Sequence, residues 1–329
     1  GVKQELFFYS LTPDTSHPVR GFRAGLSASF GEIGALYLRR QAILFDTTLA
    51  SVYQGGYASA RLGPLELYGE AVKENLSLEE RWLAGDSTPD TTALSWYASA
   101  NLGFKGFSLL AELKDYHLLN NGVNLPPPVN TYGVYATGEL DERGHGLTLR
   151  GKVGPASLMA GRYYSADTSA RHRVEENTAT LDLYTPRFQL KLGFTHALLD
   201  SVMEEEGVGY VARRTERWPR GELTFVPWRA LSISLGADLW LRQDDTLSYQ
   251  DLEVRLSVGW GPWGAITLKR QTRSTGGEWK GVELSAHLSQ GLDLIAFYGS
   301  QKGKMVCSGG VCRYEPEFEG FKALVLARF

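Results

Sequence analysis

Residues 321–329 read Phe-Lys-Ala-Leu-Val-Leu-Ala-Arg-Phe. The odd-numbered positions are Phe, Ala, Val, Ala and Phe, and the even-numbered positions are Lys, Leu, Leu and Arg. Because successive side chains of a β-strand point to opposite faces of its sheet, this segment would have one apolar face and a second face ending in cations. The segment is therefore predicted to be an amphipathic strand.

The same alternation recurs along the whole chain. A helix would repeat its apolar positions about every 3.6 residues, whereas these segments repeat at every second residue, as strands do. Clear examples are the segments 22–30, 94–102, 188–194, 231–241, 252–260 and 282–288. The chain is therefore predicted to be all-β.

The connections between these segments alternate in length. Short turns rich in Gly and Pro occur at Gly31-Glu32, Gly63-Pro64, Lys105-Gly106, Gly154-Pro155, Thr185-Pro186, Pro227-Trp228, Gly261-Pro262 and Gln290-Gly291. Longer polar stretches lie at 76–91, 118–143, 199–206, 243–247 and 302–313. Short turns at one end and long loops at the other are typical of outer-membrane barrels.

Counting the segments gives the expected architecture. We expect a transmembrane antiparallel up-and-down β-barrel of about 18 strands, formed by residues 1–329 as a single domain. A count of about 16 is the alternative, because the first segment and the region 210–225 are ambiguous.

Composition excludes other classes. The 329 residues include 34 basic and 37 acidic residues, with a formal net charge of −3, so no basic excess points to nucleic acid. No run of about 18 apolar residues exists, which excludes a bundle of transmembrane helices.

The two cysteines lie close together. Cys307 and Cys312 flank a Ser-Gly-Gly-Val segment, and a close pair in a Gly-rich turn predicts a local disulfide. A disulfide would require an oxidising compartment. A metal site or free thiols are the alternatives.

Ionisable residues of both signs alternate with the apolar ones. Charge on a lipid-facing surface costs several kcal/mol near the midplane, so the alternation predicts that these residues line a lumen. The predicted pore-lining residues are Arg150, Lys152, Lys191, Glu253, Arg255, Lys269, Arg273 and Glu283. The alternative is an interior closed by salt bridges.

The final strand with its terminal aromatic residue, Phe329, resembles the closing strand of bacterial outer-membrane β-barrels, and the whole chain resembles a porin in style. The segment 304–316 and the strand after it also resemble the end of uncharacterised Bacteroidota-type barrels. In the barrel family the last aromatic residue is part of the signal read by the assembly machinery. The resemblance implies an integral protein of the bacterial outer membrane, in contact with the lipid bilayer and lipopolysaccharide.

The longest irregular stretch, 118–143, comes early in the chain. In porins, an early long loop folds into the lumen and narrows it. By that resemblance Glu139, Asp141 and Glu142 would face Arg150 and Lys152. A solvated external loop is the alternative.

Together these observations predict a channel for passive diffusion of small polar solutes or ions, with no catalysis, cofactor or metal. One alternative is a structural barrel that sheathes or anchors another protein. A remote alternative is an omptin-like protease, based on Asp115-Tyr116-His117. A homo-oligomer is also possible on sequence grounds.

Overall fold

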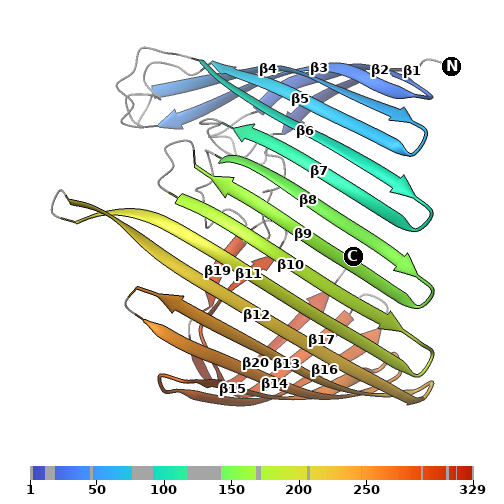
Figure 1. The fold of residues 1–329 in the computed structure, drawn as a ribbon, viewed down its shortest axis with the longest axis vertical. Coiled ribbons are helices and arrows are strands. Elements are labelled where there is room, and N and C mark those ends of the chain that lie inside the picture. The colour runs from blue at the N-terminus through green and yellow to red at the C-terminus, as the bar shows by residue number, and fades with distance from the viewer. Residues whose placement is uncertain are drawn as a thin grey trace. The chain divides into compact units, whose positions relative to one another are not determined.

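The computed structural model describes most of the chain. The described residues are 3–11, 19–44, 47–75, 92–116, 142–167, 172–205, 208–245, 247–289, 292–308, 311–315 and 317–327. Every regular element in these ranges is a β-strand (Figure 1). None of their residues belongs to a helix long and apolar enough to cross a membrane.

The strands follow one another along the chain, with the widest intervals between β5 and β6 and between β7 and β8. Their bounds are β1 Lys3–Leu11, β2 Val19–Ala28, β3 Gly31–Leu44, β4 Thr47–Leu62, β5 Leu65–Asn75, β6 Thr92–Phe104, β7 Phe107–Tyr116, β8 Glu142–Val153, β9 Ala156–Ala166, β10 His172–Tyr184, β11 Phe188–Glu205, β12 Val208–Trp228, β13 Leu231–Asp244, β14 Ser248–Trp260, β15 Gly264–Arg273, β16 Glu278–Ser289, β17 Leu292–Gln301, β18 Lys304–Ser308, β19 Val311–Glu315 and β20 Phe318–Ala327. Eighteen of them form one sheet, while β18 and β19 pair separately.

Most neighbouring strands of the main sheet are consecutive in the chain, and each printed register is antiparallel. The pairing runs from β1 to β7 at the beginning of the chain and from β12 to β17 near its end. Strand β20 then pairs with β17. This all-β, up-and-down order of antiparallel strands confirms the predicted fold class, and the main sheet has the predicted number of strands.

The chain divides into two compact units. The first unit contains residues 1–150, 161–176 and 199–211, and the second contains 151–160, 177–198 and 212–329. The boundary passes through individual strands, such as β8, instead of following a linker. A single domain therefore remains a prediction.

Tight turns explain how neighbouring strands reverse direction. Between β6 and β7, Phe104 opposes Phe107 and only Lys105 and Gly106 form the connection. Both have positive φ angles, 35° for Lys105 and 88° for Gly106. Positive φ at both central residues is the type I′ geometry, whose twist matches that of a hairpin. Glycine tolerates this conformation because it has no Cβ.

Two expected loops are strands. The region 199–206 lies mostly within β11, and 302–313 contains the hairpin of β18 and β19 instead of an irregular loop. The segments on either side of Gly309-Gly310 are short and rich in β-forming residues, which suits two paired strands. The loops 76–91 and 118–141 lie outside the described residues.

The hairpin aligns the two cysteines. Cys307 and Cys312 occupy directly opposed positions in the register of β18 and β19. Their side chains lie outside the described part of the structure, so the disulfide stays a prediction.

The sheet has an apolar face and a polar face within each unit. Large apolar side chains on the apolar face are exposed, including Leu26, Ile33, Leu67, Leu109, Leu235, Leu256, Leu268 and Val325. The intervening residues of the same strands form the polar face. This is the reverse of a water-soluble sheet, which hides its apolar face against a core.

Aromatic residues are exposed at the tight turns. Phe30 and Phe104 lie at turns of the first unit, while Trp228 and Trp263 lie at turns of the second. Trp228 is 69% exposed and Trp263 is 68% exposed, whereas Trp260 is half-buried. Such aromatic residues are typical of the girdle that flanks the apolar band of a membrane barrel.

A substitution on the apolar face tests what this face contacts. If Leu256 faces lipid, Leu256→Arg should lower the free energy of unfolding by about 2–4 kcal/mol, because a cation would enter hydrocarbon. The matched control is its neighbour Ser257 on the polar face, where Ser257→Arg removes one hydroxyl hydrogen bond with Thr267 and should cost about 1 kcal/mol. Urea unfolding in lipid vesicles measures both. Equal effects of the two substitutions would contradict a lipid-facing surface.

Candidate functional site

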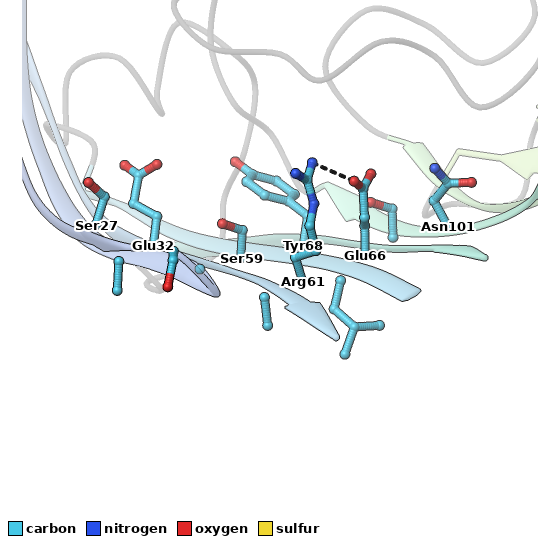
Figure 2. A pocket seen from close by; sticks show the side chains of 13 residues that line it. Ser27, Glu32, Ser59, Arg61, Glu66, Tyr68 and Asn101 are labelled. Carbon is cyan, nitrogen blue, oxygen red and sulfur yellow. Dashed lines mark ion pairs between the residues drawn. The ribbon is translucent and has the colours of Figure 1, made fainter. Parts of the chain in front are cut away.

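The polar face carries the candidate functional groups, and in the first unit it is hollowed near the tight turns. A cavity of about 410 Å³ there is lined by residues of β2–β6. Figure 2 shows the side chains of Ser27, Glu32, Ser59, Tyr68 and Asn101 rising from the same side of the sheet. The register explains this arrangement, because residues directly opposed across antiparallel strands share a face.

Glu32, which lines this cavity, is the centre of a three-residue cluster with Arg23 and Tyr57. The Tyr57 hydroxyl donates to Glu32 Oε1 at 2.5 Å, and Arg23 Nη2 lies 3.3 Å from the same oxygen. The Arg23 guanidinium also lies 4.0 Å from the centroid of the Tyr57 ring. The cluster joins β2, β3 and β4 by a charge-assisted hydrogen bond, an ion pair and a cation–π contact.

Two further carboxylates on this face are held by tyrosines. Glu70 accepts hydrogen bonds from the hydroxyls of Tyr68 and Tyr116, each at 2.7 Å. Glu112 accepts one from Tyr97 at 2.6 Å. Within the described ranges neither carboxylate forms an ion pair, so their negative charge is not neutralised by a neighbouring cation.

A buried ion pair joins β7 to β8. Lys114 donates to Glu142, and the side chains of these residues are 5% and 7% exposed. The prediction that Glu142 belongs to a constriction loop facing Arg150 is wrong, because Glu142 is the first residue of β8. Eight residues of extended strand separate it from Arg150, a distance of roughly 26 Å.

The other residues of the expected constriction and assembly signal cannot be placed. Glu139, Asp141 and Phe329 lie outside the described residues. Their predicted roles remain predictions.

The polar face of the second unit is a network of opposite charges. Arg255 contacts Asp238 at 2.8 Å and Glu253 at 2.9 Å. Lys269 contacts Glu283 at 2.7 Å. The register brings these groups together, because Arg255 opposes Lys269 and Asp238 opposes Glu253. Each of these like charges is thus paired with an opposite charge on the same or a neighbouring strand.

A second network lies nearer the loop ends of β14 and β15. Arg273 holds the Asp251 carboxylate with two hydrogen bonds, of 2.8 and 3.0 Å, and Lys302 donates to the same carboxylate. Such two-point contact fixes a guanidinium more firmly than a single bond.

A cavity of about 310 Å³ adjoins the first of these networks. Charged residues of its wall are Asp182, Lys191, Arg220, Glu222, Asp238 and Arg255. The wall therefore combines both signs of charge around a space large enough for several water molecules.

The residues predicted to line a pore lie on the polar face, and their role in a pore stays a prediction. Glu253, Arg255, Lys269, Arg273 and Glu283 share the polar face of β14–β16. Lys191 lines the cavity just described. Arg150 and Lys152 have the same parity along β8 as Glu142, whose side chain reaches Lys114 on the polar face.

The sequence prediction missed the tyrosines and one carboxylate. Tyr57, Tyr68 and Tyr116 supply hydroxyls to the polar face, and Asp251 forms the ion pairs near the loop end. The odd or even position of each residue along its strand would have indicated its face. For example, Tyr68 is two residues from both Glu66 and Glu70 and shares their face. Their partners depend on register between strands.

Of the residues suggested for a protease, the structure describes Asp115 and Tyr116. Asp115 has the parity of the exposed Leu113, so it lies on the apolar face, where its carboxylate is 3.6 Å from Arg143. Tyr116 lies on the polar face, and His117 is outside the described residues. The described part also contains no group of three His, Cys, Asp or Glu residues placed to hold a metal ion.

Comparisons with known proteins give only distant likenesses. No protein-family model and no curated protein matches the chain. The siderophore receptor PirA from Pseudomonas aeruginosa is similar in structure, with 12% identity, a TM-score of 0.48, and coverage of 91% of this chain and 65% of that chain. This chain therefore spans less than two thirds of that receptor.

Two other similar structures are a bacterial polysaccharide outer membrane secretin and a mutant of Rh. blastica porin. The secretin has 9% identity and a TM-score of 0.39, covering 95% of this chain and 91% of its own. The porin has 9% identity and a TM-score of 0.37, covering 94% and 98%. At these scores the likenesses assign no function, and the architecture rests on the strands described above.

The buried ion pair gives a stability prediction. Lys114→Met should lower the free energy of unfolding by about 3–5 kcal/mol, because it breaks an ion pair whose two side chains are both buried. The matched control is Arg61→Met, which breaks the exposed pair of Arg61 and Glu66 and should cost about 0–1 kcal/mol. Denaturant unfolding of both variants in the same detergent provides the measurement. A loss no larger than that of the control would contradict a stabilising role for the buried pair.

Proposed function

We propose that this protein is a channel of the bacterial outer membrane for passive diffusion of small polar solutes or ions. The observation that carries the proposal is the division of each unit into an apolar face with exposed Leu, Ile, Val and Phe and a polar face lined with charges. Exposure of the apolar face to water would be unfavourable, whereas in a bilayer this face would contact hydrocarbon. A closed sheet of this size would hold water on its other face.

The polar face suits passage better than tight binding of one solute. Many of its charges form pairs distributed over several strands, such as those of Arg255 and Lys269. Paired charges of both signs would favour hydrated polar molecules and set a preference among ions by their combined field. No chemical step is required of these residues.

Conductance of the purified chain tests this function. In a planar lipid bilayer, steady current steps from protein that shows heat-modifiable migration would support an open channel. A correctly folded protein that does not conduct would contradict the proposal. That result would favour the alternative in which the barrel sheathes or anchors another protein, which co-purification would then identify.

The unpaired carboxylates of the first unit predict the sign of the ion preference. Glu70 and Glu112 are held only by tyrosine hydroxyls within the described ranges, so they should attract cations. The double substitution Glu70→Gln and Glu112→Gln should shift the reversal potential in a salt gradient away from cation preference.

A charge-balanced variant is the control for this experiment. Arg61→Gln combined with Glu66→Gln also removes two charges from the polar face, but it leaves the net charge unchanged. Its reversal potential should equal that of the unsubstituted protein. An equal shift in both variants would mean that local disturbance, and not the charge of Glu70 and Glu112, sets the preference.

A further inference from the structure

A groove lies on the apolar face of strands β14–β17. Its volume is about 570 Å³. Its wall includes one row of residues paired across four strands, namely Leu256, Leu268, Val282 and Tyr298. These side chains are exposed, Tyr298 most of all at 69%. The groove is therefore an apolar depression on the surface that we propose to face lipid.

Two cations border the groove on the side of the connection 274–277. Arg270 and Lys280 are directly opposed in the register of β15 and β16, and both side chains are 64% exposed. Arg270 is two residues from Leu268 along the same strand, a separation of about 7 Å. The cations thus lie immediately beyond the apolar row, at the end of the sheet that carries the loops.

One carboxylate lies between these cations. Glu278 contacts Arg270 at 2.8 Å and Lys280 at 3.0 Å. The three side chains together keep a net charge of +1. Like charges directly opposed on a sheet repel each other. A second anion between Arg270 and Lys280 would relieve this repulsion.

We infer that this groove binds an anionic lipid, one whose headgroup carries a phosphate and a net negative charge. The phosphate contacts Arg270 and Lys280, and an acyl chain lies along the row from Leu256 to Tyr298. Guanidinium and ammonium groups are the usual protein partners of phosphate, and cations near a membrane surface attract anionic lipids. The inference rests on the proposed contact of the apolar face with the bilayer.

The arrangement favours a lipid over a soluble anion. A soluble anion would use the cations alone and gain nothing from the apolar row beside them. A lipid uses both, because its charged and hydrocarbon parts are joined at the distance that separates Arg270 from Leu268. Tyr298 also suits this boundary, since its ring is apolar and its hydroxyl is polar.

Native mass spectrometry of the full chain in detergent tests the site. The probe is dioleoyl-phosphatidylglycerol, which has a phosphate and a net negative charge. Dioleoyl-phosphatidylcholine, with the same acyl chains and no net charge, and inorganic phosphate are the comparators. The anionic lipid should remain bound at lower concentration than either comparator.

Three variants locate the binding. Arg270→Gln with Lys280→Gln should weaken binding of the anionic lipid by roughly tenfold or more, because two cations near the headgroup are lost. Glu278→Gln should strengthen it, because the competing carboxylate is removed. Arg143→Gln with Arg173→Gln removes two exposed cations of the first unit, neither of which lines the groove, and should leave binding unchanged.

Several results would overturn the inference. Equal binding of both lipids would mean that charge does not contribute, and competition by inorganic phosphate at similar concentration would assign the cations to a soluble anion. An equal loss in the two double variants would make the effect one of total charge. If the Arg270 and Lys280 variant does not fold, unchanged or weaker binding by Glu278→Gln alone contradicts the site.

The result is separable from the proposed function. A protein that conducts but does not retain the anionic lipid would lose only the lipid site. A protein that retains the lipid at Arg270 and Lys280 but does not conduct would keep the lipid-facing surface and lose only the channel.

Discussion

The hydrogen bonding of each strand to its neighbours is the constraint on which the rest of the structure depends. In a bilayer no water is present to satisfy backbone N–H and C=O groups, so each strand must be paired along its length. Pairing consecutive strands antiparallel satisfies these groups with the shortest connections, as the turn of Lys105 and Gly106 illustrates. Once the strands are paired, every side chain must point to one of only two faces.

The two faces then have separate chemistry. On the apolar face, rows such as Leu256, Leu268 and Val282 repeat across strands because the register places equivalent positions side by side. On the polar face, the same register places Arg255 beside Lys269, and carboxylates from flanking positions balance them. A shift of one residue would exchange the faces, so the ion pairs and the apolar rows depend on the same alignment.

The two units use their polar faces differently. In the second unit, cations and carboxylates are closely paired, whereas in the first unit the tyrosines hold Glu70 and Glu112 without cations. Phenolic hydroxyls can hold a carboxylate in position while leaving its charge effective at a distance. Glu70 and Glu112 are therefore held in place by neutral groups, whereas Arg255 and Lys269 are held by carboxylates.

The sequence by itself determined the all-β class, the number of strands in the main sheet, and the face on which Glu253, Arg255 and Lys269 lie. It could do so because side-chain direction in a strand depends only on the parity of the position. Which side chains contact each other was decided by the tertiary structure alone. Examples are the contact of Glu142 with Lys114 and the hydrogen bonds of two tyrosines to Glu70. The paired hairpin of β18 and β19 was also beyond the sequence pattern. These features depend on which residues of separate strands are aligned, and alignment is a property of the assembled sheet, which no single segment contains.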